Sequence, residues 1–257
     1  LFCRFNCSAT HRFVMTPILA LEHVYKAYGS KAVLVNLSLA VEAGEHVVVL
    51  GRSGSGKSVA IKCLAGLTKI DQGVVRLMGQ DITHSDENAL SALRQKLGFL
   101  FQSAALYDSM TVGDNLAFTL QHNQPKLALE IINQKVRATL RNVGLESAMD
   151  LMPGALSGGM RKRIGLARAL IIDPEVLLYD EPTAGLDPIT AKEIIDLMLR
   201  IKADYHPTAV IITHDLVCAA HTADRIVVLH EGQIIQSGTY ETLAQSKHPM
   251  VHAFFNP

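Results

Sequence analysis

The 257-residue chain has no excess of charge of either sign, because its 24 lysines and arginines match its 24 aspartates and glutamates. Nucleic acid and anionic membrane surfaces attract strongly basic proteins. The balanced charge therefore argues against nucleic acid as a partner and against membrane attachment through charge alone. Any role at a membrane would require a partner protein.

Long apolar runs are also missing. Runs such as 47–50 and 209–212 fall far short of the roughly 18 to 20 residues that a membrane-spanning helix needs. We therefore expect a chain that does not cross the membrane. Hydrophobic residues nevertheless make up 49% of it and charged residues only 19%, which is more apolar than an average soluble chain. A large core or a partner-covered surface explains this equally well.

Cysteine is scarce, and Cys3, Cys7, Cys63 and Cys218 show no paired metal-ligand spacing beyond an isolated Cys3/Cys7 pair. This usage is typical of reduced thiols in a cytoplasmic protein. Internal repeats and low-complexity linkers are absent from the sequence too. We therefore expect one folding unit, with an inserted subdomain.

The two ends of the sequence differ from its centre. Residues 1–16 have no apolar period and no stretch of about 7 to 15 apolar residues, so a signal peptide is not expected; Met15 is a candidate start. We predict an extension over 1–16 that could be disordered, a domain over 17–246 and a tail over 247–257. The tail, with Phe254 and Phe255, is expected to pack on its own or a partner subunit.

Short apolar and β-branched runs predict strands over residues 20–25, 32–39, 46–50, 74–78, 97–101, 176–179, 210–213 and 226–229, with a hairpin turn at 231–233. The run 46–50 leads into a glycine-rich loop and a helix over 58–67, which is the beginning of a parallel α/β core.

Between residues 102 and 156 the pattern changes to that of helices. Apolar side chains recur with helical spacing and are predicted to lie on one face: Leu129, Ile132, Val136, Leu140 and Val143. Gly144 stands where a C-terminal capping glycine is expected. We therefore predict a helical insertion over about 103–156.

The segment 51–58 reads GRSGSGKS and fits the phosphate-loop pattern G-x-x-x-x-G-K-[S/T]. Its glycines permit positive φ, so that backbone N–H groups at a helix N-terminus can surround phosphates. The predicted nucleotide-binding residues are Gly51, Ser53, Gly54, Ser55, Gly56, Lys57 and Ser58. Lys57 would reach the β- and γ-phosphates, and Ser58 would ligate Mg²⁺.

Asp180 ends the apolar run 176–179, and Glu181 follows it directly. A carboxylate at the carboxyl end of a parallel strand, beside a phosphate loop, can hold a metal through water. The ordinary interpretation is a solvated acidic pair at a strand end. The neighbouring motifs favour the metal site.

Ser157, Gly158 and Gly159 precede a helix whose apolar residues are Met160, Ile164, Ala167 and Ile171. Ser157 is a good N-cap residue, so one interpretation is a capped helix with a basic outer face at residues 161–163. Two glycines after the cap also expose backbone donors at the positive end of the helix dipole. That arrangement suits an external phosphate.

Together these motifs resemble the ATP-binding subunit of an ABC transporter, over about residues 19–242. The resemblance implies an α/β fold: a P-loop NTPase core of ABC type with an N-terminal antiparallel β subdomain and an inserted α-helical subdomain. It implies ATP and Mg²⁺ as cofactors, with Glu181 orienting and polarising the attacking water. Ser157, Gly158 and Gly159 would close over the γ-phosphate held by a second copy of the chain, giving a head-to-tail dimer with two ATP molecules at its interface.

Four further residues match the family pattern. Tyr28 stands where an aromatic ring stacks on adenine, Gln102 where the glutamine loop couples the metal site to the helical insertion, and His214 where a histidine contacts the γ-phosphate. Asp187 corresponds to a loop that contacts the opposite subunit. Taken singly, each has an ordinary interpretation: a core or surface tyrosine, a solvated glutamine, a satisfied histidine, and a turn or helix N-cap before Pro188.

Within the family, the strings FQSAALY (101–107), LSGGMRKR (156–163) and DEPTAGLDPIT (180–190) are similar to those of bacterial MCE-type (Mla) lipid transport ATPases. Polar amino-acid importers more often carry Gln at the position of Met160. The resemblance implies integral membrane permease subunits and a periplasmic MCE-domain lipid-binding protein as partners. It also implies a peripheral location on the cytoplasmic face of the bacterial inner membrane.

Alternatives remain open at this point. The apolar residues Leu106, Tyr107 and Met110 belong either to a groove for a permease helix or to the core of the insertion. The chain could instead power an amino-acid or other small-molecule importer. A soluble ABC ATPase acting on ribosomes or DNA usually has two fused ATPase domains or a long coiled-coil insertion. A small-molecule kinase is disfavoured by the Ser-Gly-Gly segment and His214.

Overall fold

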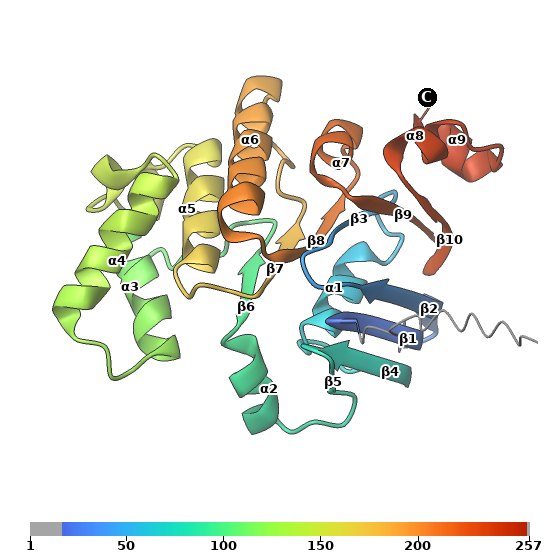
Figure 1. Ribbon diagram of the computed structural model, residues 1–257, viewed down its shortest axis with the longest axis horizontal. Coiled ribbons are helices and arrows are strands. Elements are labelled where there is room, and N and C mark those ends of the chain that lie inside the picture. Colours follow the sequence, from blue (N-terminus) through green and yellow to red (C-terminus); the bar gives the residue numbers. More distant parts are fainter. Residues whose placement is uncertain (1–16, 256–257) are drawn as a thin grey trace, which may run out of the picture.

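The computed structural model describes residues 17–255 as two sheets with helices around them (Figure 1). The expectations for residues 1–16, including the Cys3/Cys7 pair and the start at Met15, lie outside the described residues. Within 17–255, no helix combines the length and apolar character that crossing a bilayer requires.

The larger sheet of the described chain has the strand order β10-β9-β3-β8-β7-β6. Its strands are β3 (His46–Leu50), β6 (Leu97–Leu100), β7 (Val176–Asp180), β8 (Thr208–Thr213), β9 (Arg225–His230) and β10 (Gln233–Gly238). All of them run parallel except β10, which pairs antiparallel with β9. Every residue of β3, β7 and β8 is buried, which explains why these strands are continuous apolar runs in the sequence.

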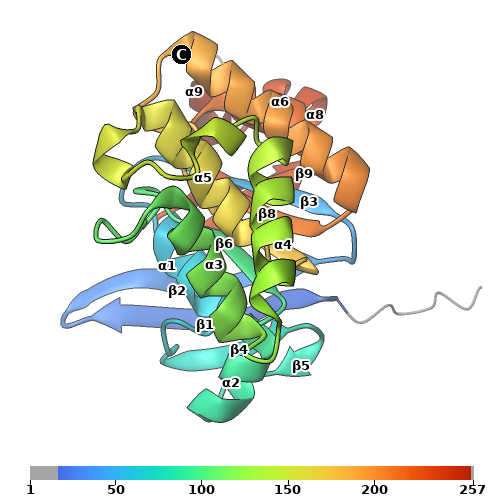
Figure 2. The same ribbon diagram turned by 90° about the vertical axis from the view of Figure 1, so that its left-hand side faces the viewer.

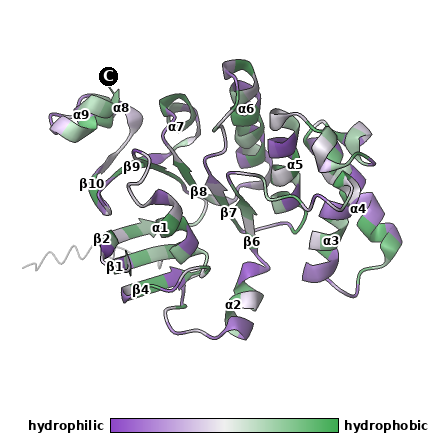
Figure 3. Cartoon of the chain, turned by 180° about the vertical axis from the view of Figure 1, so that it is seen from behind, coloured by the Kyte–Doolittle hydropathy of each residue, from purple (hydrophilic) through white to green (hydrophobic). Residues whose placement is uncertain are grey.

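The smaller sheet is antiparallel and has the order β2-β1-β4-β5. Its strands are β1 (Leu19–Tyr28), β2 (Lys31–Val41), β4 (Gln72–Leu77) and β5 (Gln80–Asp81). Helix α1 (Lys57–Leu64) contacts both sheets, and its buried residues Ile61 and Leu64 belong to a core cluster shared with both. By contrast α2 (Glu87–Arg94) buries only Leu90 and mixes hydrophilic with hydrophobic residues (Figure 3).

A helical region lies at the opposite end of the molecule from the antiparallel sheet (Figures 1 and 2). It contains α3 (Val112–Asn123), α4 (Leu129–Asn142), the short turns η1 (Glu146–Ala148) and η2 (Pro153–Ala155), and the beginning of α5 (Gly158–Leu170). The predicted α/β core with an antiparallel β subdomain and a helical insertion is thus confirmed.

The predicted apolar face of α4 is confirmed at four of its five positions, since Ile132, Val136, Leu140 and Val143 are buried. The prediction is wrong for Leu129, whose side chain is 68% exposed. Leu129 is the first residue of α4, and the buried face begins one turn later. Gly144 follows the helix with φ of +72°, as a capping glycine should.

The remaining helices are α6 (Pro188–Tyr205), α7 (Leu216–Thr222), α8 (Tyr240–Ala244) and α9 (Pro249–Phe255). The tail packs on its own chain, which is one of the two expected arrangements. The Phe255 ring lies 5.2 Å from that of Tyr240, and Phe254 and Phe255 both pack against the main core. The hairpin turn before β10 is also confirmed, with positive φ at Glu231 and Gly232.

Candidate functional site

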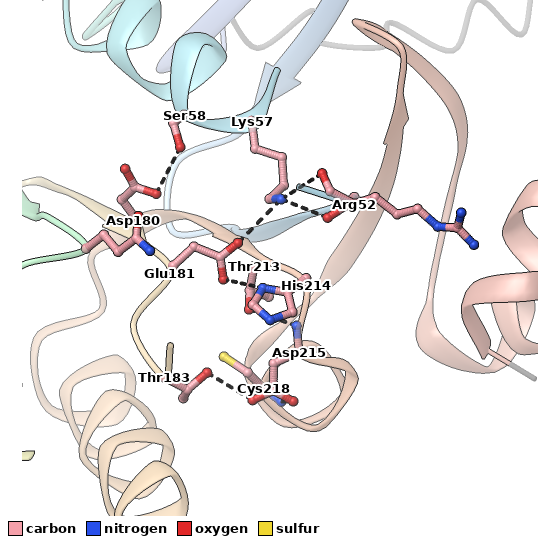
Figure 4. Close-up of polar contacts among 12 residues, drawn as sticks. Arg52, Lys57, Ser58, Asp180, Glu181, Thr183, Thr213, His214, Asp215 and Cys218 are labelled. Atoms are coloured by element: carbon pink, nitrogen blue, oxygen red, sulfur yellow. Dashed lines mark hydrogen bonds and ion pairs between the residues drawn. The ribbon is translucent and has the colours of Figure 1, made fainter. Parts of the chain in front are cut away.

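The carboxyl ends of β3, β7 and β8 bring three separate segments of the chain to one edge of the larger sheet (Figure 4). A cavity of about 1040 Å³ lies there. Most of the predicted nucleotide and catalytic residues line it, namely Tyr28, Ser53, Gly54, Gly56, Lys57, Ser58, Gln102, Glu181 and His214. Parallel strands end at the same edge, which is why residues far apart in sequence meet here.

The glycines of the loop are required by its conformation. Gly54 and Gly56 have φ of +80° and +106°, in the region that side chains disfavour. A Cβ at Gly51 would lie 2.6 Å from the Leu229 carbonyl oxygen, and one at Gly56 would lie 2.8 Å from that of Val33. The loop therefore needs glycine at these positions, as is typical of phosphate-binding loops.

Lys57 is buried at the start of α1. Its Nζ donates hydrogen bonds to the carbonyl oxygens of Gly51, at 2.7 Å, and Arg52, at 3.2 Å. It also lies 3.4 Å from Glu181 Oε1, so the loop and the carboxylate share one ammonium group (Figure 4). This places a fixed positive charge where the loop would hold phosphate oxygens.

Ser58 Oγ donates a hydrogen bond of 3.3 Å to Asp180 Oδ1. Burial raises the pKa of Asp180, the Ser58 hydrogen bond opposes that shift, and the neighbouring Glu181 adds to it. A bound cation would favour the ionised carboxylate. Within residues 17–255, no three His, Cys, Asp or Glu side chains are grouped as a metal site. A hydroxyl and a carboxylate suit Mg²⁺, which keeps several waters and is completed by substrate phosphates.

Glu181 adopts φ of +50° directly after β7, and its backbone N–H donates to the Ile212 carbonyl oxygen at 2.9 Å. Its Oε2 lies 2.9 Å from His214 Nδ1. Positive φ is unfavourable for a residue with a side chain and often marks functional sites. Next to this pair, Thr183 Oγ1 donates to Asp215 Oδ2 at 2.9 Å, which joins the loops after β7 and β8.

Tyr28 and Gln102 stand at the rim of the cavity. Tyr28 is 53% exposed, and Lys26 Nζ lies 5.4 Å from the centre of its ring. Gln102 is exposed, two residues after the end of β6, and also lines the cavity. An exposed aromatic ring and an exposed amide at the rim are available to a ligand.

Ser157, Gly158, Gly159 and Asp187 do not line this cavity. Ser157 caps α5 by accepting the Met160 N–H at 3.2 Å, so the predicted cap is confirmed. Gly158 and Gly159 open α5 beside the N-terminus of α6, where a Cβ on Gly159 would collide with Thr190. The Ser-Gly-Gly segment thus lies outside the lining of the cavity beside the phosphate loop of its own chain.

Asp187 forms the N-cap of α6, and this ordinary interpretation is confirmed. Its Oδ1 accepts the N–H groups of Ile189 and Thr190, both at 3.0 Å, and Thr190 Oγ1 donates to its Oδ2 at 2.6 Å. The hydrogen bonds from Thr190 lower the pKa of Asp187. The residue therefore carries a negative charge beside the Ser-Gly-Gly segment.

The predicted basic outer face of α5 is wrong at Lys162, which is only 5% exposed. Its Nζ donates to the carbonyl oxygens of Gln102, at 2.6 Å, and Glu181, at 2.8 Å. The helical period contained a signal: Lys162 shares a face with Gly165 and Ala169, which are also buried. Sequence reasoning also did not predict that Phe254, on the tail helix, lines the cavity.

Comparisons with known proteins agree with this geometry. Residues 34–184 match a sequence family described as ABC transporter. The chain is 37% identical over 249 residues to the probable ribonucleotide transport ATP-binding protein mkl of Mycobacterium tuberculosis, covering 97% of this chain and 69% of that protein. It is 38% identical to protein TRIGALACTOSYLDIACYLGLYCEROL 3, chloroplastic, of Arabidopsis thaliana, with 92% and 73% covered. It is 37% identical to the methionine import ATP-binding protein MetN of Brucella abortus, with 92% and 64% covered.

Among solved structures, a bacterial ABC transporter cassette, MJ0796, has the same fold with a TM-score of 0.81 and 30% sequence identity. The match covers 86% of this chain and 98% of the cassette, which was solved as a dimer. A second structure of that cassette, in a post-hydrolysis state bound to ADP and Pi, matches equally well. Similarity of sequence and of fold therefore extends over most of the chain.

Proposed function

The chain belongs to the ABC transporter family and is an ATPase that couples hydrolysis to transport; on this premise we propose that its cargo is phospholipid or another lipid, moved between bacterial membranes. The observation that supports the ATPase chemistry best is the contact of Lys57 and His214 with one carboxylate, that of Glu181. The lipid cargo is supported by the strings around Gln102 and Met160, and by one relative whose name contains that of a galactolipid.

In the proposed mechanism the loop 51–58 surrounds the phosphates of ATP, and Lys57 leaves its carbonyl partners for the β- and γ-phosphates. Ser58, Gln102 and, through water, Asp180 would hold Mg²⁺, which when bound would supply positive charge against the phosphates. Glu181 orients the attacking water and polarises its O–H bond. Phosphoryl transfer depends mainly on such positioning and on charge stabilisation.

His214 and Tyr28 complete the proposed half-site. An ionised carboxylate can only accept hydrogen bonds, so His214 donates its Nδ1–H to Glu181 and leaves Nε2 directed elsewhere. That second nitrogen is then available to the γ-phosphate. The exposed ring of Tyr28 provides a surface on which adenine can stack.

We propose that a second copy of the chain completes each site. Ser157, Gly158 and Gly159 lie outside the cavity of their own chain, yet their backbone N–H groups form a helix N-terminus suited to an anion. A twofold dimer would place them on the γ-phosphate bound by the partner, as the dimeric form of the related cassette supports. Loss of the γ-phosphate after hydrolysis would then release the interface.

The permease is expected to bind at a second cavity, of about 670 Å³, near α2, α3 and the segment after β6. Tyr107 and Phe118 line it, are 47% and 42% exposed, and pack edge to face at 5.3 Å. Leu106, by contrast, packs against the core. An exposed aromatic pair in a groove suits an apolar helix. Integral membrane permease subunits are therefore proposed partners, which would hold the chain at the cytoplasmic face of the inner membrane. A periplasmic MCE-domain protein is proposed from the sequence resemblance alone.

A small-molecule importer is the second candidate, because MetN and mkl are as similar to this chain as the lipid-named relative, and their names give methionine and ribonucleotide transport. The test is purification of the chain with its permease from membranes, followed by mass spectrometry of bound lipid and by ATPase assays with lipid or amino acids added. Specific phospholipid retention and lipid-stimulated hydrolysis are expected. Stimulation by methionine or another small solute, without lipid retention, would reject the lipid cargo.

A further inference from the structure

Lys162 connects two loops of the proposed catalytic site without itself lining the cavity. One ammonium group donates to the carbonyl oxygen of Gln102, at 2.6 Å, and to that of Glu181, at 2.8 Å. These carbonyls belong to the segments that follow β6 and β7, two neighbouring parallel strands. Lys162 therefore fixes the spacing between the two loops at the residues that carry the proposed chemistry.

Both loops have conformations that need support. Glu181 has φ of +50°, and Ala104 and Ala105, just after Gln102, have φ of +61° and +47°. Left-handed conformations in residues with side chains are unfavourable and persist where surrounding contacts hold them. The two hydrogen bonds from Lys162 hold the Gln102 carbonyl, two residues before Ala104, and the carbonyl of Glu181 itself.

Helix α5, which carries Lys162, contacts the Gln102 loop at further points. Arg168 donates hydrogen bonds to the carbonyl oxygens of Ala104 and Ala105. Gly165 allows Ala104 to approach α5 closely, because a Cβ at position 165 would lie only 2.9 Å from the Cβ of Ala104. Residues 162, 165 and 168 follow one face of α5. The face that holds the glutamine loop thus begins five residues after Ser157.

A buried lysine ammonium group is unusual for a contact that is purely structural. Burial lowers the pKa of Lys162, while Asp180 and Glu181 oppose that shift. Neither carbonyl partner is an ion, so the energy of removing the ammonium from water is recovered only in part. The nearby carboxylates account for the charge, and they belong to the proposed catalytic site.

We propose that Lys162 is a positioning residue for ATP hydrolysis, which fixes the backbone of Glu181 and Gln102 relative to the helix that carries Ser157, Gly158 and Gly159. This inference rests on the proposed function, because it assigns Lys162 to the geometry of that site. A displacement of the Glu181 peptide would move its carboxylate relative to the attacking water while leaving the phosphate loop intact. Lys162 should therefore affect turnover far more than nucleotide affinity.

The experiment compares K162M and K162R with wild type in the purified full chain. Steady-state ATPase assays give kcat and KM, a fluorescent ATP analogue gives Kd, and thermal melting reports folding. We expect K162M to lower kcat roughly 10- to 100-fold, as small misplacements of reacting groups do, with Kd unchanged within about twofold. K162R, which keeps a cationic donor, should recover most of the lost kcat. K135M removes a surface ion pair between Lys135 and Asp173 and should match wild type in all three measurements.

Several outcomes would overturn the inference. A kcat of K162M within twofold of wild type would show that the two carbonyls need no fixing, and a parallel loss of ATP affinity would show a general structural role. If K162M does not fold, K162Q, which retains an amide donor, is judged by the same criteria. Failure of both to fold would identify a folding residue instead. A wild-type chain without ATPase activity would contradict the proposed function and not the role of Lys162 alone.

Discussion

Glu181 and His214 form a 2.9 Å hydrogen bond between Oε2 and Nδ1, although 33 positions separate them in the sequence. Each follows a parallel strand, β7 for Glu181 and β8 for His214, and these strands are neighbours in the larger sheet. The bond fixes which histidine nitrogen faces the carboxylate and which faces the cavity. It also leaves Oε1 of Glu181 to Lys57, so both carboxylate oxygens already have defined directions.

The first prediction concerns Glu181→Gln. The amide keeps the size of the side chain but cannot draw a proton from water, so ATP binding should persist while hydrolysis falls at least about 100-fold. The ATP-bound dimer should then accumulate, which size-exclusion chromatography with ATP and Mg²⁺ can measure. E175Q, which removes a surface partner of Lys96, serves as the control. Full turnover in E181Q would remove Glu181 from its proposed role.

The second prediction concerns Ser157→Ala. In the proposed dimer this residue acts on the partner's nucleotide, so turnover and ATP-driven dimerisation should fall while ATP affinity of the monomer stays within about twofold. Loss of the N-cap alone should destabilise α5 by about 1 kcal/mol. Thr239→Ala removes the corresponding cap of α8, where Thr239 accepts the Thr242 N–H, and separates this effect from catalysis. An equal loss of monomer affinity in S157A would contradict the assignment to the opposite subunit.

Much of the cavity could be predicted from sequence because its residues follow buried strands. The run 46–50 is observed as β3 with the same bounds, and Asp180 ends β7 as expected. Once these strands are parallel, their carboxyl ends must lie together. Motif order and strand position were therefore sufficient to bring Lys57, Asp180 and Glu181 into one site.

Other features depend mainly on tertiary contacts. Lys162 belongs to a basic string that predicts a surface face; its helical spacing from Gly165 and Ala169 is a weak sign of burial, and the contact with the Gln102 loop is not visible in the sequence. Phe254 lines the cavity from the tail helix, and the sequence alone does not indicate where that helix packs. Leu129 fits the helical period but lies at the exposed beginning of α4.

The third prediction concerns pH and His46. This histidine is buried at the start of β3, Nε2 lies 3.1 Å from the Pro207 carbonyl oxygen, and burial lowers its pKa to about 4. The unfolded chain binds the proton near pH 6.5, whereas the folded chain binds it only near pH 4. Folding is therefore favoured above about pH 6.5, and stability falls as pH decreases from 6.5 toward 4, by up to about 3 kcal/mol.

Denaturant unfolding of wild type and H46Q between pH 7.5 and pH 4.5 tests this expectation. The glutamine can still donate to the Pro207 carbonyl but does not titrate, so the variant should lose part of the pH dependence that wild type shows. H252Q replaces an exposed histidine on α9 and should retain the wild-type dependence. Identical pH profiles for H46Q and wild type would show that His46 does not control stability in this range.

The last prediction concerns Tyr179→Phe. Tyr179 lies in β7, is 1% exposed, and its hydroxyl has no hydrogen-bond partner within the described chain. Burial raises its pKa strongly, so the group remains a neutral, unsatisfied donor. Burying such a hydroxyl without a partner costs about 1 to 3 kcal/mol. Removing it leaves the ring and its packing in place, so Y179F should raise the free energy of unfolding by about 1 kcal/mol. Denaturant unfolding at pH 7 measures the change in the free energy of unfolding. Y205F serves as the control: its tyrosine hydroxyl accepts a hydrogen bond from Asn142, so this variant should not gain stability.

A loss of more than about 1 kcal/mol in Y179F would mean that the hydroxyl has a partner in solution. The strand before Asp180 would then be held by a polar contact as well as by its apolar core.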